Sequence, residues 1–344
     1  MCKSMFKLLG VVMLVALIAQ AARGADLIFN WSGGASGDAM WECYANPYGK
    51  VTGIRVIHDT AVNFSKLKAM VETGNVQYDL AELYGMDLYE IGLKQNLFEP
   101  IDYTVVKKSD DYFEGTFLSH AVIHDYYATV LSYDASKYPQ GKAPQSWEDF
   151  WNVKTFPGSR ALYNGPLNNL EFALLADGVK PENLYPLDMD RAFKSLDKIK
   201  KYVKVWWSAG AQPAQLLTDK EVVMASAWNG RIYDIIKGGA KVGIQWNQGI
   251  IMRSPVVVPK GAPNKKQAME FLDQFSNPDY QACFANKLGY PGTYKYLSEK
   301  VNAEVRPYLV TYPDNMEKMI WNNYKWWVEH KAEAEERWSA WMLK

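Results

Sequence analysis

Residues 27–44 read LIFNWSGGASGDAMWECY, and they set the architecture that we expect for the chain. The apolar run at residues 27–31 predicts a buried first strand. A glycine-rich turn follows at residues 32–37, and residues 38–44 are expected to begin a helix. A strand that leads through a tight turn into a helix is the opening unit of an α/β sheet.

The same alternation continues beyond this opening unit. Alternating apolar residues predict a second strand at residues 53–59, and residues 78–81 predict a short third strand. Helices are expected at residues 63–72, where apolar side chains recur at helical spacing, and at residues 87–94. This order predicts an α/β fold with a largely parallel sheet and helices on both faces.

The rest of the chain carries signals of the same kind. Ser146 is a good N-cap for a short helix, because its hydroxyl can accept from a free backbone N–H. Further strands are expected at residues 126–133, 221–227 and 250–259, and further helices at residues 190–201, 265–275 and, as one long terminal helix, 315–343.

The first 24 residues have the layout of a secretory signal peptide. Lys3 and Lys7 form a basic start, residues 8–18 form an apolar run, and Ala22 and Gly24 place small side chains at the cleavage site. A retained membrane anchor is the alternative, but the run is shorter than the roughly 20 residues that a transmembrane helix needs. We therefore expect cleavage near Gly24 and a soluble, exported, periplasmic protein.

Composition limits the class of protein. Without its signal, the 344-residue chain is still too long for one ordinary core and suits two lobes. It carries 38 basic and 38 acidic residues, so it lacks the basic excess of a nucleic-acid binder. Its 13 tryptophans are more than packing alone requires, and some of them are expected to line a ligand cavity.

Cysteines and histidines give two further expectations. Cys43 and Cys283 remain after signal cleavage and could pair in an oxidising periplasm, but nothing in the sequence brings them together, so the pairing stays open. The four histidines are not accompanied by a Cys/His cluster, so neither a zinc site nor a cofactor is expected.

Several segments together resemble the spermidine/putrescine-binding proteins, which are the periplasmic receptors of ABC importers. Each segment is weak alone, but their order and spacing are specific, and they cover essentially the whole mature chain. The segments are residues 30–31, 78–80, 146–151, 157–159, 227–230, 264–273, 277–279 and 288–291.

The resemblance implies a two-lobed periplasmic-binding-protein fold of type II-like organisation, with a ligand cleft between lobes joined by crossing strands. It also implies an inner-membrane permease as partner, a small-molecule ligand and a monomeric receptor. The crossings are expected near residues 127–131, near residues 250–254 and near Lys300. Lobe 1 then comprises residues 25–128 plus 254–300, and lobe 2 comprises residues 129–253 plus 301–344.

The charged residues favour a ligand with an acidic end. Polyamine receptors carry Trp-Met-Asp-Ser at the second crossing, whereas residues 251–254 read Ile-Met-Arg-Ser here, so Arg253 replaces the aspartate. Arg231 adds a second guanidinium, and a guanidinium binds a carboxylate through two parallel hydrogen bonds. The interpretation is a short ω-amino acid such as γ-aminobutyrate, held by arginine and an aromatic box.

Glu82 is the first choice for the ammonium partner, with Asp38 and Asp125 behind it. The glycine-rich turn at residues 32–37 either donates N–H groups to an anion or is a simple strand-to-helix turn. The predicted ligand-binding residues are Trp31, Ser32, Glu82, Tyr84, Tyr126, Trp207, Gln212, Trp228, Arg231 and Arg253.

Three alternatives remain open. The first is a putrescine- or spermidine-binding protein, and the second is a ferric-ion or aminophosphonate receptor, because the adjacent Tyr126 and Tyr127 superficially fit iron ligands. The third is a secreted hydrolase or transferase. An enzyme is not expected, since the chain contains no GxSxG motif and no Cys/His pair with supporting spacing.

Overall fold

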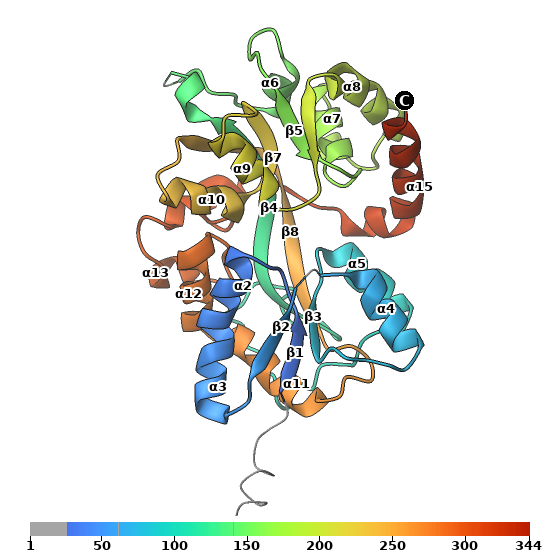
Figure 1. The fold of residues 1–344 in the computed structure, drawn as a ribbon, viewed down its shortest axis with the longest axis vertical. Helices are drawn as coiled ribbons and strands as arrows, with labels where there is room; N and C mark the ends of the chain where they lie inside the picture. Colours follow the sequence, from blue (N-terminus) through green and yellow to red (C-terminus); the bar gives the residue numbers. More distant parts are fainter. Residues whose placement is uncertain (1–25, 61, 140) are drawn as a thin grey trace, which may run out of the picture.

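The computed structural model describes residues 26–344, apart from positions 61 and 140. The expected signal peptide at residues 1–24 lies outside this range. Within the described part of the chain, no helix is both long and apolar enough to cross a membrane. The described residues form two lobes, stacked one above the other in Figure 1.

The lower lobe is built on the opening unit. Strand β1 (Leu27–Asn30) lies between β2 (Val56–Asp59) and β3 (Leu80–Glu82), and it pairs parallel with both. The three strands therefore end at one edge, as the βαβα pattern predicts. That edge faces the upper lobe (Figure 1).

The upper lobe repeats the arrangement with three other strands. β5 (Arg160–Tyr163) pairs parallel with β6 (Val203–Trp207) and with β7 (Met224–Trp228). Because β7 then pairs antiparallel with a strand that comes from the lower lobe, the described strands form a single sheet, in the order β2-β1-β3-β8-β4-β7-β5-β6 with β9 beside β8.

Two long strands join the lobes. β4 (Val122–Asp134) and β8 (Val242–Val257) pair antiparallel along most of their lengths, and Figure 1 shows both running from one lobe into the other. Both are longer than expected, because the strand predicted at residues 250–259 begins at Val242 and the one predicted at residues 126–133 begins at Val122. Their register shifts between Thr129 and Leu131, near the middle of the crossing.

Helices cover both faces of the sheet. Ser146 caps the first helix of the upper lobe as expected, since its hydroxyl accepts from the Asp149 N–H at 3.3 Å. The helices are α2 (Ala35–Met40), α3 (Asn46–Thr52), α4 (Phe64–Glu72), α5 (Met86–Lys94), α6 (Trp147–Trp151), α7 (Asn169–Ala176), α8 (Met189–Lys200), α9 (Gln212–Thr218), α10 (Asn229–Lys237), α11 (Lys265–Leu272), α12 (Pro278–Leu288), α13 (Leu297–Lys300), α14 (Pro313–Met316) and α15 (Tyr324–Met342), with a π-helical turn, η1 (Trp41–Ala45), between α2 and α3.

The expectation of one helix over residues 315–343 is wrong. The short α14 is followed by a two-residue strand, β9 (Ile320–Trp321), which pairs parallel with β8. Helix α15 starts only after Asn323, whose side chain accepts from the Trp326 N–H at 3.2 Å and caps it. A strand pairing and a cap together interrupt the helical pattern.

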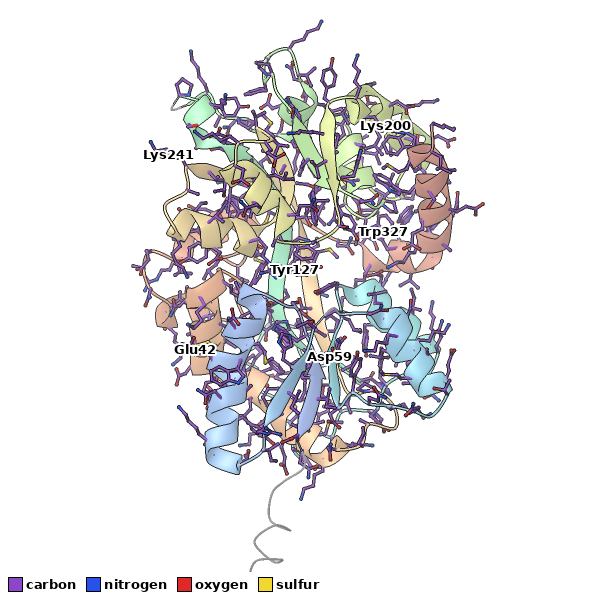
Figure 2. All side chains as sticks on the ribbon, viewed as in Figure 1. Glu42, Asp59, Tyr127, Lys200, Lys241 and Trp327 are labelled. Carbon is purple, nitrogen blue, oxygen red and sulfur yellow. A yellow bond between two sulfur atoms is a disulfide. The ribbon has the colours of Figure 1, made fainter. Side chains whose placement is uncertain are left out.

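This strand also moves the third crossing. We expected it near Lys300, whereas β9 lies beside the middle of β8, later in the chain. The reason is apolar packing: Val301, Val305 and Leu309 are buried in one cluster with Ala282 and Ala285 of α12, which holds this segment on the lower lobe. The chain then reaches the upper lobe, where Trp327 of α15 donates a hydrogen bond to Glu171 of α7 (Figure 2).

A disulfide bond joins two helices of the lower lobe. Cys43 of η1 is bonded to Cys283 of α12, with 5.7 Å between their Cα atoms, so the pairing that the sequence left open is formed. The two cysteines are 240 positions apart in the chain. A cross-link over so long a loop restricts the unfolded chain and stabilises the folded one.

Replacing both cysteines, Cys43→Ala with Cys283→Ala, is expected to lower the free energy of unfolding by about 2–4 kcal/mol, because the unfolded chain regains the freedom that the bond removes. Urea unfolding of the oxidised wild type and the double variant measures this difference. Reduction of the wild type is the control and should give the same loss, whereas an unchanged midpoint after reduction would contradict the prediction.

Candidate functional site

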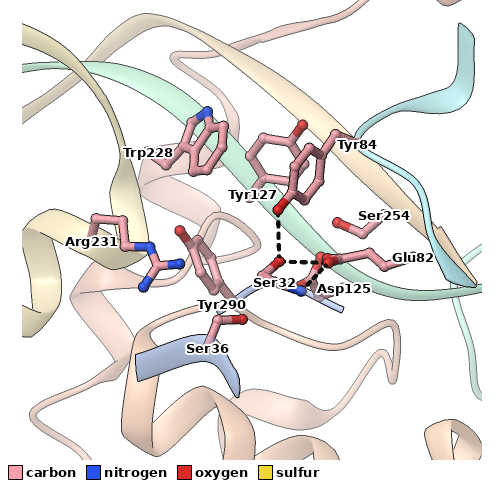
Figure 3. A pocket seen from close by; sticks show the side chains of 10 residues that line it. All are labelled: Ser32, Ser36, Glu82, Tyr84, Asp125, Tyr127, Trp228, Arg231, Ser254 and Tyr290. Atoms are coloured by element: carbon pink, nitrogen blue, oxygen red, sulfur yellow. Dashed lines mark hydrogen bonds between the residues drawn. The ribbon is translucent and has the colours of Figure 1, made fainter. Parts of the chain in front are cut away.

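One pocket lies where the two lobes meet, at the carboxyl ends of strands from each. Its empty volume is about 360 Å³, part of which is open to solvent, and side chains of opposite charge stand at its two ends (Figure 3). Ligands of open α/β sheets bind at such strand ends, where loops and helix starts converge. The lining residues are Ser32, Ser36, Glu82, Tyr84, Asp125, Tyr127, Trp228, Arg231, Ser254 and Tyr290.

The acidic end is organised around Glu82, the last residue of β3. The Ser32 hydroxyl donates to Glu82 Oε2 at 2.5 Å, and the Ser32 N–H donates to the same oxygen at 3.1 Å. The Tyr84 hydroxyl in turn donates to Ser32 Oγ at 3.1 Å. Because Ser32 stands two residues after the end of β1, the neighbouring strands β1 and β3 together hold this carboxylate in place.

Asp125 of β4 adds a second carboxylate at this end. Burial raises its pKa to about 6, an effect that His124 opposes and that the Glu82 charge increases. His124 is fully buried, with its Nε2 3.4 Å from Asp125 Oδ2 and 3.5 Å from Glu82 Oε1. Its ring packs against Trp31, with centroids 4.4 Å apart. Two carboxylates of the pocket thus lie close to one buried imidazole behind them.

Arg231 provides the basic end. It stands in the first turn of α10, and its Nη2 donates to the Gly33 carbonyl of the other lobe at 3.3 Å. Its Nε is buried and has no partner among the described residues, and Arg231 joins none of the ion pairs that they make. The guanidinium therefore retains capacity to bind an anion. Figure 3 shows it across the pocket from Glu82 and Asp125.

Four aromatic rings form the walls between the two charged ends. The Trp228 ring centroid lies 5.7 Å from that of Tyr84 and 5.9 Å from that of Tyr127, and Tyr290 is 6.5 Å from Tyr127. Burial raises the pKa of Tyr84, of Tyr127 and of Tyr290, so all three phenols stay neutral. Ring faces suit both methylene groups and cations.

The Trp228-Asn229-Gly230 segment lines the pocket and is hydrogen-bonded to β4 and to the end of α12. Asn229 is fully buried; its Oδ1 accepts from the Ala128 N–H at 2.9 Å, and its Nδ2 donates to the Gly289 carbonyl at 3.1 Å. A Cβ atom on Gly230 would lie 2.4 Å from the Tyr290 ring and 2.5 Å from the Leu288 carbonyl oxygen. Glycine is therefore required sterically for Tyr290 to reach the pocket.

Half of the predicted ligand-binding residues line this pocket, and the structure brings them together from three segments of the chain. They are Ser32, Glu82, Tyr84, Trp228 and Arg231. The other predicted residues, Trp31, Tyr126, Trp207, Gln212 and Arg253, do not line it.

Trp31, Trp207 and Gln212 lie behind the pocket wall or beside it. The Trp31 side chain is fully buried, and its Nε1 donates to Ser36 Oγ at 3.2 Å. Trp207 packs edge-on against Trp228, with centroids 5.8 Å apart. Gln212 starts α9, where its Oε1 accepts from the Ser208 N–H. Trp31 and Trp207 thus support residues that line the pocket.

Tyr126 and Arg253, both predicted to contact the ligand, lie outside this pocket. The two residues are partners across β4 and β8, and they point to the face opposite the pocket, where each packs against Trp321. Their neighbours Tyr127 and Ser254 face the pocket instead. Successive side chains of a strand point to opposite faces, so Tyr126 and Arg253 lie on the other side of the two strands from Tyr127 and Ser254.

Five lining residues were not in the list of predicted ligand-binding residues: Ser36, Asp125, Tyr127, Ser254 and Tyr290. Tyr127 and Ser254 could have been found from strand alternation, which pairs them with Asp125 on one face. Tyr290 stood within a segment that carried the resemblance, but its path into the pocket depends on Gly289, which has a φ of 68° and ends α12. Asp125, the second-choice ammonium partner, does line the pocket.

The described residues contain no group of three or more His, Cys, Asp or Glu side chains placed to hold a metal ion. Tyr126 and Tyr127 point to opposite faces of β4, so they cannot ligate one ion together. The ferric-ion alternative rested on this pair of adjacent tyrosines, so the structure removes its basis.

Comparisons with known proteins show the family of this chain. Residues 44–306 match the family of bacterial extracellular solute-binding proteins. A γ-aminobutyric acid-binding protein of Pseudomonas aeruginosa is 37% identical over 318 residues, which are 91% of this chain and 89% of that protein. The spermidine/putrescine-binding periplasmic protein of Escherichia coli is 24% identical over 292 residues, covering 80% of this chain and 82% of that protein.

A solved structure extends the comparison to the fold. The periplasmic binding protein AgtB of A. tumefaciens R10, in complex with agropinic acid, superposes with a TM-score of 0.84. It is 32% identical in sequence, and the match covers 93% of this chain and 99% of that one. The two-lobed α/β fold that the resemblance implied is confirmed.

Gly230→Ala is expected to lower the free energy of unfolding by about 1–3 kcal/mol, because the new methyl group forces Tyr290 or the Leu288 carbonyl to move. Gly238→Ala, at the other end of α10, is the matched control, since its Cβ would meet nothing closer than 3.3 Å. Thermal or urea unfolding of both variants measures the difference. Equal stability of the two variants would show that the contact with Tyr290 is not tight.

Proposed function

Because this chain belongs to the family of bacterial extracellular solute-binding proteins, we propose that it is the periplasmic substrate-binding component of an ABC importer whose ligand is a short ω-amino acid such as γ-aminobutyrate. The single observation that supports this ligand is the separation of charge in the pocket. Glu82 and Asp125 stand at one end, and Arg231 stands at the other (Figure 3).

A zwitterion with separated charges matches this arrangement at both ends. The ammonium group pairs with Glu82 and Asp125. The carboxylate accepts two parallel hydrogen bonds from the Arg231 guanidinium. The methylene chain between them lies against Tyr84, Tyr127 and Trp228. Charge pairs are stronger in a buried pocket than in water, so each end contributes to selectivity as well as affinity.

The same arrangement disfavours a diamine. A second ammonium group would be placed next to the Arg231 guanidinium, and like charges at close range cost several kcal/mol in a binding site. The basic end therefore argues against the polyamine alternative. Two relatives support the choice of a ligand with an acidic group, since one is named for γ-aminobutyric acid and the other holds agropinic acid.

The remaining features follow from this function. We propose that the signal peptide is cleaved near Gly24, that the monomeric receptor delivers its ligand to an inner-membrane permease, and that it releases the ligand chemically unchanged. The lobes expected from the sequence are residues 25–128 plus 254–300 and residues 129–253 plus 301–344; we place the last boundary at β9 instead, because Val301, Val305 and Leu309 pack on the lower lobe. β4, β8 and β9 then form the hinge, and small dihedral changes in them would move the lobes relative to each other.

Titration calorimetry of the mature protein tests the ligand directly. Saturable binding of γ-aminobutyrate is expected, with no binding of butyrate, which lacks the ammonium group, and none of putrescine, which lacks the carboxylate. Agropinic acid is included in the panel because a related protein binds it. Binding of putrescine without γ-aminobutyrate would establish the polyamine alternative and overturn the role given to Arg231.

Arg231→Gln is expected to weaken γ-aminobutyrate binding about 100-fold, because the ligand carboxylate loses its charged partner. Arg253→Gln is the matched control, since it removes a guanidinium from the opposite face of the crossing strands, outside this pocket. Calorimetry on both variants, with thermal unfolding to check the fold, measures the effect. Equal loss in both variants would contradict the assignment.

The affinity is expected to fall as the pH drops below about 6. The pKa of Asp125 is raised to about 6, so the carboxyl gains a proton below that pH and the ammonium group loses one negative partner. The fall is at most about tenfold per pH unit for one proton. Asp125→Asn should bind more weakly at neutral pH and lose this dependence, and a wild-type affinity that stays constant down to pH 5 would rule out the role of Asp125.

A further inference from the structure

A buried histidine, His124, lies directly behind the acidic end of the pocket. Its side chain is fully buried, and neither ring nitrogen has a hydrogen-bond partner among the described residues. Buried polar groups normally have partners, so two free nitrogens on one ring need an explanation. His124 does not line the pocket, so its effect on a ligand has to pass through a neighbouring side chain.

A bulge in β4 aims this ring at the two acids of the pocket. Between Ile123 and Asp125 the strand advances by two residues, while its partner β8 advances by one. His124 is therefore the extra residue of the bulge. In a regular strand its side chain would point away from that of Asp125. Here its Nε2 lies 3.4 Å from Asp125 Oδ2 and 3.5 Å from Glu82 Oε1.

The two carboxylates determine which ring nitrogen carries a hydrogen. An ionised carboxylate oxygen only accepts hydrogen bonds, and Nε2 has one such oxygen on each side. A lone pair on Nε2 would be repelled by both oxygens, so this nitrogen carries the hydrogen. The imidazole is also packed among three aromatic rings, whose centroids lie 4.4, 5.5 and 5.9 Å from its own: Trp31, Phe275 and Phe284.

The position of this N–H bears on the ionisation of Asp125. Burial raises the pKa of Asp125 to about 6, and the Glu82 charge raises it further, whereas His124 and the Ser254 hydroxyl lower it. The other ionisable groups that face Asp125 are phenols, which stay neutral because burial raises their pKa: Tyr44, Tyr127 and Tyr290. His124 thus counteracts the mutual repulsion of two buried carboxylates.

We propose that His124 is a positioning residue for the ammonium end of the ligand, a role that rests on the function proposed above. Its Nε2–H lies between Asp125 Oδ2 and Glu82 Oε1, orients both carboxylates and keeps them ionised. Asp125 Oδ1 is buried without a hydrogen-bond partner among the described residues, and it is left to accept from the ammonium group. The ligand itself does not touch the imidazole.

Two substitutions separate this role from simple packing. His124→Gln keeps an N–H near the position of Nε2 but loses the ring. His124→Phe keeps a ring among Trp31, Phe275 and Phe284 but loses the N–H. If the ring served only for packing, the phenylalanine variant would resemble the wild type more closely. The proposal expects the reverse order.

Carbon NMR of the Asp125 carboxyl in the full mature protein, without ligand, measures the effect, and Asp125→Asn assigns the signal. The wild type should titrate near pH 6. His124→Phe should raise the midpoint by about one pH unit or more, while His124→Gln should stay close to the wild type. An unchanged midpoint in His124→Phe, or an equal rise in both variants, would overturn the proposal.

Nitrogen NMR of the wild-type imidazole does not depend on how well the variants fold. A hydrogen on Nε2 is expected, and a neutral ring with its hydrogen on Nδ1 would refute the role given to His124.

Calorimetry with γ-aminobutyrate then tests the role in binding. The affinity of His124→Phe should begin to fall at a higher pH than that of the wild type, whereas a packing defect would lower the affinity by the same factor at every pH. A profile parallel to that of the wild type would therefore contradict the proposal. If the wild type does not bind γ-aminobutyrate, the proposed function fails, while the carboxyl titration still decides whether His124 acts on Asp125.

Discussion

The antiparallel pairing of β4 with β8 is the constraint on which the rest of the structure depends. These two strands belong to both lobes, so every residue on them is placed relative to both halves of the molecule at once. Tyr127, near the centre of the molecule in Figure 2, lies on one face of this ribbon with Asp125 and Ser254. Arg253 lies on the other face. A backbone ladder with a side-chain period of two therefore separates the residues of the pocket from those on the opposite face.

The pocket keeps opposite charges apart, and that separation costs stability in the absence of ligand. Asp125 and Glu82 are both buried at one end, and the raised pKa of Asp125 reflects the cost of ionising a carboxyl away from water. Arg231 at the other end is held by one carbonyl from the opposite lobe rather than by an acid. This arrangement favours ligand binding. A ligand with an ammonium group and a carboxylate would pair with the buried acids at one end and with Arg231 at the other, and these pairings offset the cost of burying unpaired charges.

The fold and much of the site could be predicted from local sequence. Alternating apolar patterns located the strands of the lower lobe, and Ser146 marked the start of a helix by its capping chemistry. Glu82, Tyr84, Trp228 and Arg231 were predicted from their places at or just after the ends of strands, and all four line the pocket. The prediction of one helix over residues 315–343 was wrong because β9 interrupts it. β9 forms through pairing with β8, which lies about 70 positions away in the sequence, and local periodicity carries no information about so distant a partner.

The sequence by itself indicated the class of this protein: an α/β chain of the solute-binding type, with a predicted export signal, no net charge and many aromatic residues. Only the tertiary structure decided which side chains meet that molecule. Arg253 and Ser254 are neighbours in the chain, yet the pleat of β8 sends them to opposite faces. Cys43 and Cys283 are 240 positions apart, yet the packing of η1 on α12 joins them. Sequence patterns report local conformation, whereas a site is assembled from strand register and long-range packing, which local patterns do not encode.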